Sequence, residues 1–172
     1  MTFSQYLAYK PPPGFRDELI HGEVRLSPSA KAEHQHICKR LERLLDAAIN
    51  AEFVAQRDTT IYVSGDEGPR PDVFVIAKDR WNKARASAPG YPEGVPELVI
   101  EVRSASNSDP EFDQKRAVYF SDGRCLAFWV VNPDARSATV FTPTASPQVV
   151  SHGSIRLPGE LGLPVAFEEI FS

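Results

Sequence analysis

Three short apolar runs constrain the fold of this chain more than any other feature of its sequence. They lie within residues 70–77, 97–102 and 126–132, and each contains at least three consecutive apolar residues. Runs of this kind, without alternating polar positions, are typical of interior strands that are covered on both faces. Such strands need helices to cover them, so the three runs predict an α/β architecture with a central sheet.

The segments between these runs supply the covering helices. Residues 31–50 contain one apolar stripe at helical spacing, formed by Ile37, Leu41, Leu44, Leu45 and Ala48. This stripe predicts a long amphipathic helix. A second helix is predicted to begin with Asp109 as its N-cap and Pro110 at its first position, and to end near Asp122. Gly123 is then expected to be its left-handed C-cap.

The remaining segments predict a mixed sheet and an N-terminal hairpin. Residues 17–26 contain two short apolar runs around His21-Gly22, which indicates a β-hairpin. Residues 53–63 contain two short strand candidates, the second at 59–63, and residues 78–94 are expected to form a loop. Residues 137–142 predict a strand antiparallel to the one before it. Residues 149–150 and 155 are expected to add edge strands, and 163–171 to close the core.

Composition and charge place further limits on what the protein is. The 172 residues, 42% of them hydrophobic and 24% charged, suit one globular domain: we expect an N-terminal arm at 1–16, poorly ordered or on the surface, and a domain at 17–172. No run approaches the roughly 20 apolar residues of a membrane span, and the N-terminus lacks a signal-peptide pattern. We therefore expect a cytoplasmic protein without a membrane partner, whose Cys38 and Cys125 remain reduced.

The net charge of -4 argues against a protein that coats nucleic acid. An activity on nucleic acid would need a local basic patch, a metal ion that offsets acidic ligands, or weak and transient binding.

Two carboxylates stand on the predicted buried strands. Asp72 follows Pro71 at the start of one strand, and Glu101 follows the apolar run of the next. Burying a charge without a partner is costly, so such positions point to a paired or metal-bound carboxylate. Two or three carboxylates around one site bind Mg²⁺, which lowers the pKa of a water molecule and stabilises charge on a phosphate. Lys115, on the following helix, is placed to stabilise a developing oxyanion.

Several segments resemble one known family. Asp72, followed by Glu101 two residues before Arg103, resembles the PD-(D/E)XK signature of the restriction-endonuclease-like superfamily. More narrowly, the chain resembles the Uma-two family of endonucleases within it. The matching segments are 18–24, Ser27-Pro28 with His34, 70–73, 96–102, Lys115 with Tyr119 and Gly123, 128–133, and 157–171. Their order and spacing together carry the resemblance over residues 17–171.

The resemblance implies a restriction-endonuclease-like fold and a DNA endonuclease that depends on Mg²⁺ or Mn²⁺. It implies that Asp72 and Glu101 bind the metal together with the backbone carbonyl of Val102. It also implies that the motif lysine has moved from the strand to the helix, at Lys115. Arg103 occupies the strict lysine position, and an arginine cannot serve as a base, so we prefer Lys115 for the cationic role. DNA as substrate and a homodimer are carried over as expectations.

Other polar residues are accessory candidates. Glu23, on the predicted hairpin, is either a third acidic ligand or an exposed strand residue, and Glu18 is a weaker candidate for the same role. His34 matches a family position and is a candidate for the metal site or the substrate. His36 lies only two residues away on the same helix, so it faces another side and is expected to be solvent-exposed.

Each site residue also has an ordinary structural explanation. Asp72 could simply bond to a turn, and Glu101 could pair with an arginine such as Arg70 or Arg103. Lys115 could pair with Glu111, four residues earlier on the helix.

The alternative functions come from other classes. One is a catalytically inactive nuclease-fold module that binds DNA or assembles with proteins. The others are a structural dimer and, more weakly, an acid–base enzyme for a small molecule. Nuclease activity, metal binding and DNA binding distinguish these possibilities.

Overall fold

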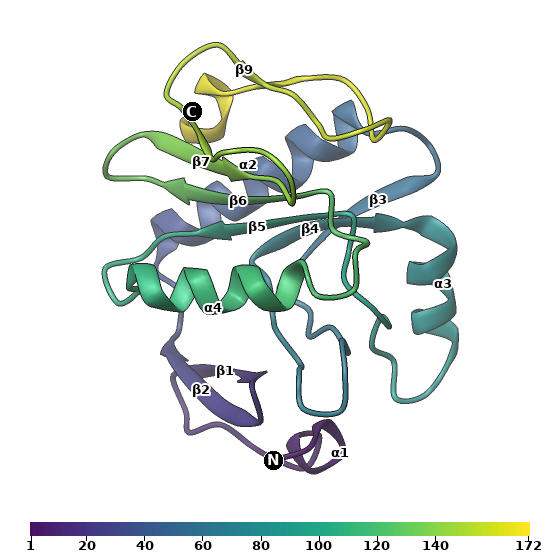
Figure 1. The fold of residues 1–172 in the computed structure, drawn as a ribbon. Helices are drawn as coiled ribbons and strands as arrows, with labels where there is room; N and C mark the ends of the chain where they lie inside the picture. Colours follow the sequence, from purple (N-terminus) through teal and green to yellow (C-terminus); the bar gives the residue numbers. More distant parts are fainter.

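A six-stranded mixed sheet forms the centre of the protein, which the computed structural model describes over residues 1–172 (Figure 1). The strands are β3 (Phe53–Arg57), β4 (Val73–Ala77), β5 (Leu98–Val102), β6 (Ala127–Asn132), β7 (Ser137–Phe141) and β8 (Gln148–Val150), in that spatial order. β5 and β6 pair in parallel, and every other neighbouring pair is antiparallel. The predicted mixed sheet is confirmed, including the antiparallel pair β6–β7.

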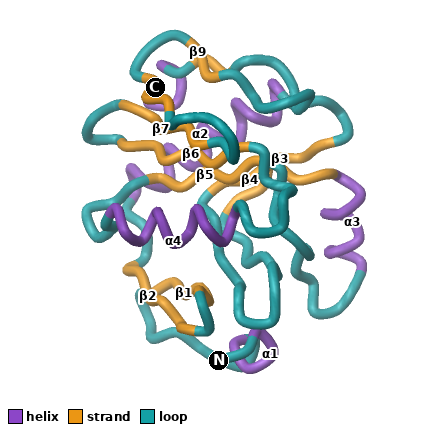
Figure 2. The backbone as a smooth tube through the Cα atoms, viewed as in Figure 1, coloured by secondary structure: helices purple, strands orange, loops and turns teal.

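Helices cover both faces of this sheet. α2 (Ala32–Ala48) lies behind the sheet and α4 (Asp109–Tyr119) in front of it, while α3 (Lys78–Ala86) lies beyond its edge (Figures 1 and 2). The single parallel pair follows from this arrangement, because the chain returns from β5 to β6 through a crossover helix, α4. Both long predicted helices are confirmed, but α4 ends at Tyr119 with Phe120 as its C-cap, before the predicted end near Asp122, so Gly123 is not its C-cap.

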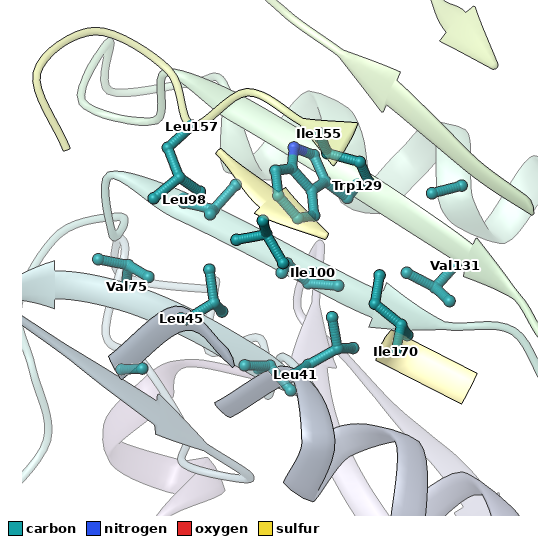
Figure 3. Packing of buried hydrophobic residues seen from close by; sticks show 14 of the residues in the cluster. Leu41, Leu45, Val75, Leu98, Ile100, Trp129, Val131, Ile155, Leu157 and Ile170 are labelled. Carbon is teal, nitrogen blue, oxygen red and sulfur yellow. The ribbon is translucent and has the colours of Figure 1, made fainter. Parts of the chain in front are cut away.

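The core has two layers because alternate residues of each strand face opposite sides. Behind the sheet, Leu41 and Leu45 of α2 pack against Val75 and Ile100 (Figure 3). In front of it, a smaller cluster of buried side chains joins α4 to the other strand face; its members include Val99, Phe112, Tyr119, Phe128 and Val130. The central strands are therefore covered by packed side chains on both faces.

The N-terminal hairpin is separate from the central sheet. Its strands β1 (Phe15–Ile20) and β2 (Glu23–Pro28) pair antiparallel around His21 and Gly22, which both have positive φ. This is the predicted hairpin, with a two-residue turn of the type that positive φ values allow. In Figure 1 it lies beyond α4, on the side of the molecule away from the C-terminal segment.

The first residues fold back onto this hairpin. A helical turn, α1 (Phe3–Tyr6), buries Phe3 and Tyr6 in a cluster with Leu19 of β1. Gly68 permits this approach, since a Cβ atom there would lie 2.7 Å from the Phe3 ring. Part of the predicted arm is thus packed, because the prolines begin only at Pro11, after the aromatic residues that anchor it.

Three other predictions about local structure were wrong. Residues 78–94 are not all loop, since α3 occupies 78–86; only Ala84 of this helix is buried, so no apolar stripe signals it. Residues 59–63 form no strand, and Tyr62 makes only an isolated bridge to Glu93. The N-cap of α4 is Ser108, one residue before the predicted Asp109.

The C-terminal segment completes the core as predicted. β9 (Ser154–Ile155) and β10 (Val165–Ala166) form a small antiparallel sheet of their own, and the turn η1 (Glu168–Phe171) follows. Ile155, Phe167 and Ile170 are buried against the α2 face. Both cysteines are unpaired and buried, and no helix has the length and apolar character of a membrane span.

Candidate active site

Asp72 and Glu101 line one cavity of about 400 Å³. Antiparallel pairing of β4 with β5 places Val73 opposite Ile100, so the next position of the ladder brings Asp72 and Glu101 to the same end of the two strands. The cavity wall consists of the hairpin, the start of α2, the β5–α4 loop and one side of α4. Both carboxylates are otherwise buried. The two acidic groups predicted from the sequence therefore line the same cavity.

Hydrogen bonds hold the Asp72 carboxylate in one orientation. Its Oδ2 accepts the backbone N–H of Val102 at 2.8 Å and lies 3.2 Å from Nε2 of His34. The same Nε2 lies 3.1 Å from the carbonyl oxygen of Val102. Oδ1 accepts a hydrogen bond from the guanidinium of Arg16 at 3.1 Å. The start of α2 therefore positions His34 so that it contacts both Asp72 and the Val102 carbonyl.

These contacts favour the ionised form of Asp72. Burial raises the pKa of its carboxyl, but the hydrogen bond and charge of His34, together with Arg16, lower it to about 2. Burial lowers the pKa of the His34 imidazole, yet the hydrogen bond and the charge of Asp72 raise this pKa above its ordinary value. Asp72 is therefore ionised at neutral pH, and its carboxylate can accept hydrogen bonds or bind a cation.

Glu101 belongs to a second set of contacts, centred on α4. Its Oε1 accepts from the Tyr119 hydroxyl at 2.6 Å and lies 2.8 Å from Nζ of Lys115. Lys115 also lies 3.0 Å from Glu18 of the hairpin. The helix periodicity brings Lys115 and Tyr119 to the same face of α4, since they are four residues apart. Lys115 is paired with these carboxylates and not with Glu111, which caps the helix instead.

Burial and the neighbouring charges together set the pKa values in this second set of contacts. It raises the pKa of the Glu101 carboxyl to about 7, with the charges of Asp72 and Glu18 adding to the effect and Lys115 opposing it. Burial lowers the pKa of Lys115, but Glu101 and Glu18 outweigh it, so the pKa lies above its ordinary value. Lys115 therefore remains a cation at neutral pH and is not a base.

The oxygen atoms around the cavity suit a hard divalent cation. Oε2 of Glu101 accepts no hydrogen bond, and the only fully buried side-chain polar atom without a partner is Nε1 of Trp129. Oε2 is therefore open to the cavity. Oδ1 of Asp72 has one donor, and the Val102 carbonyl accepts only from His34, so each retains a free lone pair. Three such oxygens match the ligand preference of Mg²⁺ or Mn²⁺.

A second group of possible ligands lies behind Asp72. His34, Cys38 and Asp72 place ligand atoms within 4.8 Å of one another. Cys38 is part of the hydrophobic core, however, and burial raises the pKa of its thiol. A protonated, enclosed thiol is a poor ligand. The cavity oxygens are therefore the better match to a metal ion.

Comparisons with known proteins identify the family and the fold of this chain. The sequence pattern of the Uma2 family, described as "Putative restriction endonuclease", matches residues 3–170. The chain belongs to the Uma2 family. A crystal structure from Anabaena variabilis ATCC 29413, described as a putative nuclease belonging to DUF820, superposes with a TM-score of 0.81 at 17% identity. The match covers 99% of this chain and 97% of that one, which confirms the predicted nuclease-type fold. No curated protein matches this sequence.

Two accessory candidates of this Uma2 protein lie away from the carboxylates. Glu23 is exposed on β2 and does not line the cavity, since the hairpin register places it opposite Ile20. Arg103 reaches the cavity wall but pairs with Asp109 and stacks on the Phe112 ring, so it contacts neither acidic group. The alternative pairing of Glu101 with an arginine is wrong.

Two residues of the hairpin reach the site although their sequence signal is weak. Arg16 lies outside the predicted candidates and Glu18 is a weaker candidate than Glu23, yet both Arg16 and Glu18 reach the site. Alternation along β1 was an available signal, because residues 16 and 18 face the same side of a strand. His34 reaches the site as the resemblance implied, whereas His36 is exposed and contacts the backbone of Ser172.

Proposed function

We propose that this protein is a Mg²⁺-dependent endonuclease that hydrolyses phosphodiester bonds of DNA. One observation carries the proposal: two buried carboxylates on adjacent strands share a cavity with a buried lysine. Membership of the Uma2 family supports the same reaction class. Mn²⁺ is expected to replace Mg²⁺, because both accept octahedral oxygen coordination.

The residues divide into ligands and a charge-stabilising group. Asp72, Glu101 and the Val102 carbonyl would hold the cation, which supplies Lewis acidity and a water molecule of lowered pKa. Lys115 carries a fixed positive charge beside Glu101, so it stabilises negative charge that develops on the phosphate. His34 keeps Asp72 and the Val102 carbonyl in place from behind. Tyr119 fixes the Glu101 carboxylate through its hydroxyl.

Nuclease assays of single variants test the proposal. Asp72→Ala and Glu101→Gln are expected to lower cleavage of plasmid DNA with Mg²⁺ at least 100-fold, because each removes a metal ligand. Asp134→Asn is the matched control, since Asp134 lines the same cavity but is exposed and forms no ion pair. Cleavage should also stop in EDTA and return with Mn²⁺. Undiminished cutting by both site variants would contradict the assignment.

A catalytically inactive DNA-binding or assembly module is the second candidate. It is favoured by the pairing of Lys115 with two carboxylates, which leaves this lysine fewer free donors for a phosphate. Calorimetry separates the two functions: an inactive module would bind DNA without taking up Mn²⁺. The homodimer and the cytoplasmic location stay part of the proposal, and light scattering of the purified protein tests the former.

A further inference from the structure

Arg16 connects the hairpin to the proposed metal site. Its guanidinium donates to Oδ1 of Asp72 at 3.1 Å and lies 2.7 Å from Oδ1 of Asp58. The side chain is 20% exposed and lines the cavity, whereas the side chain of Asp72 is 8% exposed. A guanidinium with two carboxylate partners at separate nitrogens is fixed in space, and here it faces the space that a ligand would enter.

The Asp72 oxygen that Arg16 contacts is the one available to a metal ion. Oδ2 already accepts from the Val102 N–H and faces His34, so a cation in the cavity would use Oδ1. Two cations in contact with one carboxylate oxygen repel each other strongly at this degree of burial. Metal binding at the remaining lone pair of Oδ1 would therefore weaken the Arg16 contact with Asp72 and favour its release. The second contact, with Asp58, does not involve the metal ligands.

We propose that Arg16 is a substrate-binding residue that neutralises Asp72 until a divalent cation replaces it. Arg16 then stays anchored through Asp58, and its freed nitrogen binds a phosphate oxygen of the nucleic acid. The planar fork of a guanidinium suits this role, because it can hold a carboxylate with one edge and a phosphate with the other. This inference rests on the proposed function, since it requires the metal to bind at Asp72.

Arg70 provides a matched control for the charge of Arg16. It lines the same cavity and also donates to Oδ1 of Asp58, at 2.9 Å. It makes no contact with Asp72, and its other carboxylate partner is Asp17, at 3.8 Å. Removing either arginine takes one positive charge from the cavity. Only the removal of Arg16 takes away a group that competes with the metal.

Calorimetry with Mn²⁺ alone provides the first measurement. Arg16→Gln is expected to bind Mn²⁺ about tenfold more tightly than the wild type, because no ion pair has to be broken. Arg70→Gln should stay within about threefold of the wild type, as expected for a charge without direct contact. Circular dichroism and the melting temperature check that each variant is folded.

DNA binding in Ca²⁺ provides the second measurement, by fluorescence anisotropy of a labelled duplex. Arg16→Gln should bind about tenfold more weakly than the wild type, because a charged donor to phosphate is lost, and Arg70→Gln should lose less. The expected signature is thus a gain in metal affinity with a loss in DNA affinity. If Arg16→Gln does not fold, Arg16→Lys replaces it. Lysine is shorter and has a single charged nitrogen, so it cannot hold Asp58 and Asp72 at separate nitrogens, and the affinities for Mn²⁺ and DNA should change in the same directions as in Arg16→Gln.

The outcomes separate this inference from the proposed function. Equal Mn²⁺ affinity in the wild type and Arg16→Gln, or an equal gain in Arg70→Gln, overturns the role of Arg16 and leaves the metal site intact. An unchanged DNA affinity overturns the phosphate contact. If neither the wild type nor the variants bind Mn²⁺, the metal site itself fails, and the inference fails with it. Mn²⁺ binding by Arg16→Gln alone supports competition at Asp72.

Discussion

Lys115 is a buried positive charge between Glu18 of the hairpin and Glu101 of the sheet. Its side chain is only 12% exposed, so neither solvent nor salt screens these contacts strongly. Such a pair need not stabilise the fold relative to apolar residues, but removing one partner leaves buried charge uncompensated. Lys115 therefore joins three parts of the protein, and its loss affects stability as well as chemistry.

Lys115→Met is expected to lower the free energy of unfolding by about 3 kcal/mol, because the acidic side chains of Glu18 and Glu101 then share a buried space without their cation. Adding Glu18→Gln should recover about 1 kcal/mol by removing one of these charges. Urea denaturation measures both effects. Lys39→Met serves as control, since Lys39 is exposed on α2 and forms no ion pair. Equal stability of Lys115→Met and the wild type would show that this ion-pair cluster does not hold the hairpin.

The acidic site residues could be found from sequence because they break a pattern. Asp72 and Glu101 are charged positions next to apolar runs, and burial makes such exceptions informative. Arg16 and Glu18 break no pattern, because charged residues are ordinary on a hairpin strand. Their place in the site depends on how β1 packs over the cavity, which is a long-range contact that no local sequence feature records.

At the scale of elements, the start of α4 determines where Lys115 lies. Glu111 accepts hydrogen bonds from the backbone N–H of Ser108 at 2.6 Å and from its hydroxyl at 2.9 Å. Pro110 follows at a position that tolerates the missing N–H. The cap fixes the first turn of α4, and the helical repeat then places Lys115 and Tyr119 on the same face of the helix. Glu111 thus acts on the site through the helix and not through Lys115.

Glu111→Ala is expected to cost about 1 kcal/mol of unfolding free energy, because the first turn of α4 loses its cap acceptor. Glu111→Gln keeps a side-chain oxygen at the same place and should lose less than half as much. Thermal and urea unfolding of both variants give the comparison. A loss of equal size in the two would assign the effect to the negative charge near the helix N-terminus instead of to the hydrogen bonds.

Element prediction succeeded where periodicity was strong and failed where packing decides. Helix α2 and strands β4, β5 and β6 could be predicted because their buried apolar residues form a regular stripe or a continuous run in the sequence. α3 has no such repeat, and Arg80 holds its start by contacts with Glu97 and with the carbonyls of 93–95. Those partners lie 13 to 17 residues away in the sequence, so the local pattern of residues 78–86 does not reveal them.

At the scale of the whole molecule, a net charge of -4 opposes binding to DNA. The cavity itself carries both signs, with Arg16, Arg70 and Lys115 beside acidic residues. A divalent cation at Asp72 and Glu101 would change the local charge by two units and release Arg16 toward a phosphate. DNA affinity should therefore depend on the divalent ion itself and not only on ionic strength.

Anisotropy with a labelled duplex at constant ionic strength tests this dependence. The wild type is expected to bind DNA at least tenfold more tightly in Ca²⁺ than in EDTA, because the ion neutralises the two carboxylates that repel phosphate. Glu101→Gln removes one of those charges, so in EDTA it should bind at least as tightly as the wild type, yet it should gain little from Ca²⁺. Asp134→Asn loses the same charge elsewhere in the cavity and should respond to Ca²⁺ as the wild type does. A Ca²⁺ response in Glu101→Gln as large as in the wild type would mean that the ion acts on the DNA or on another surface.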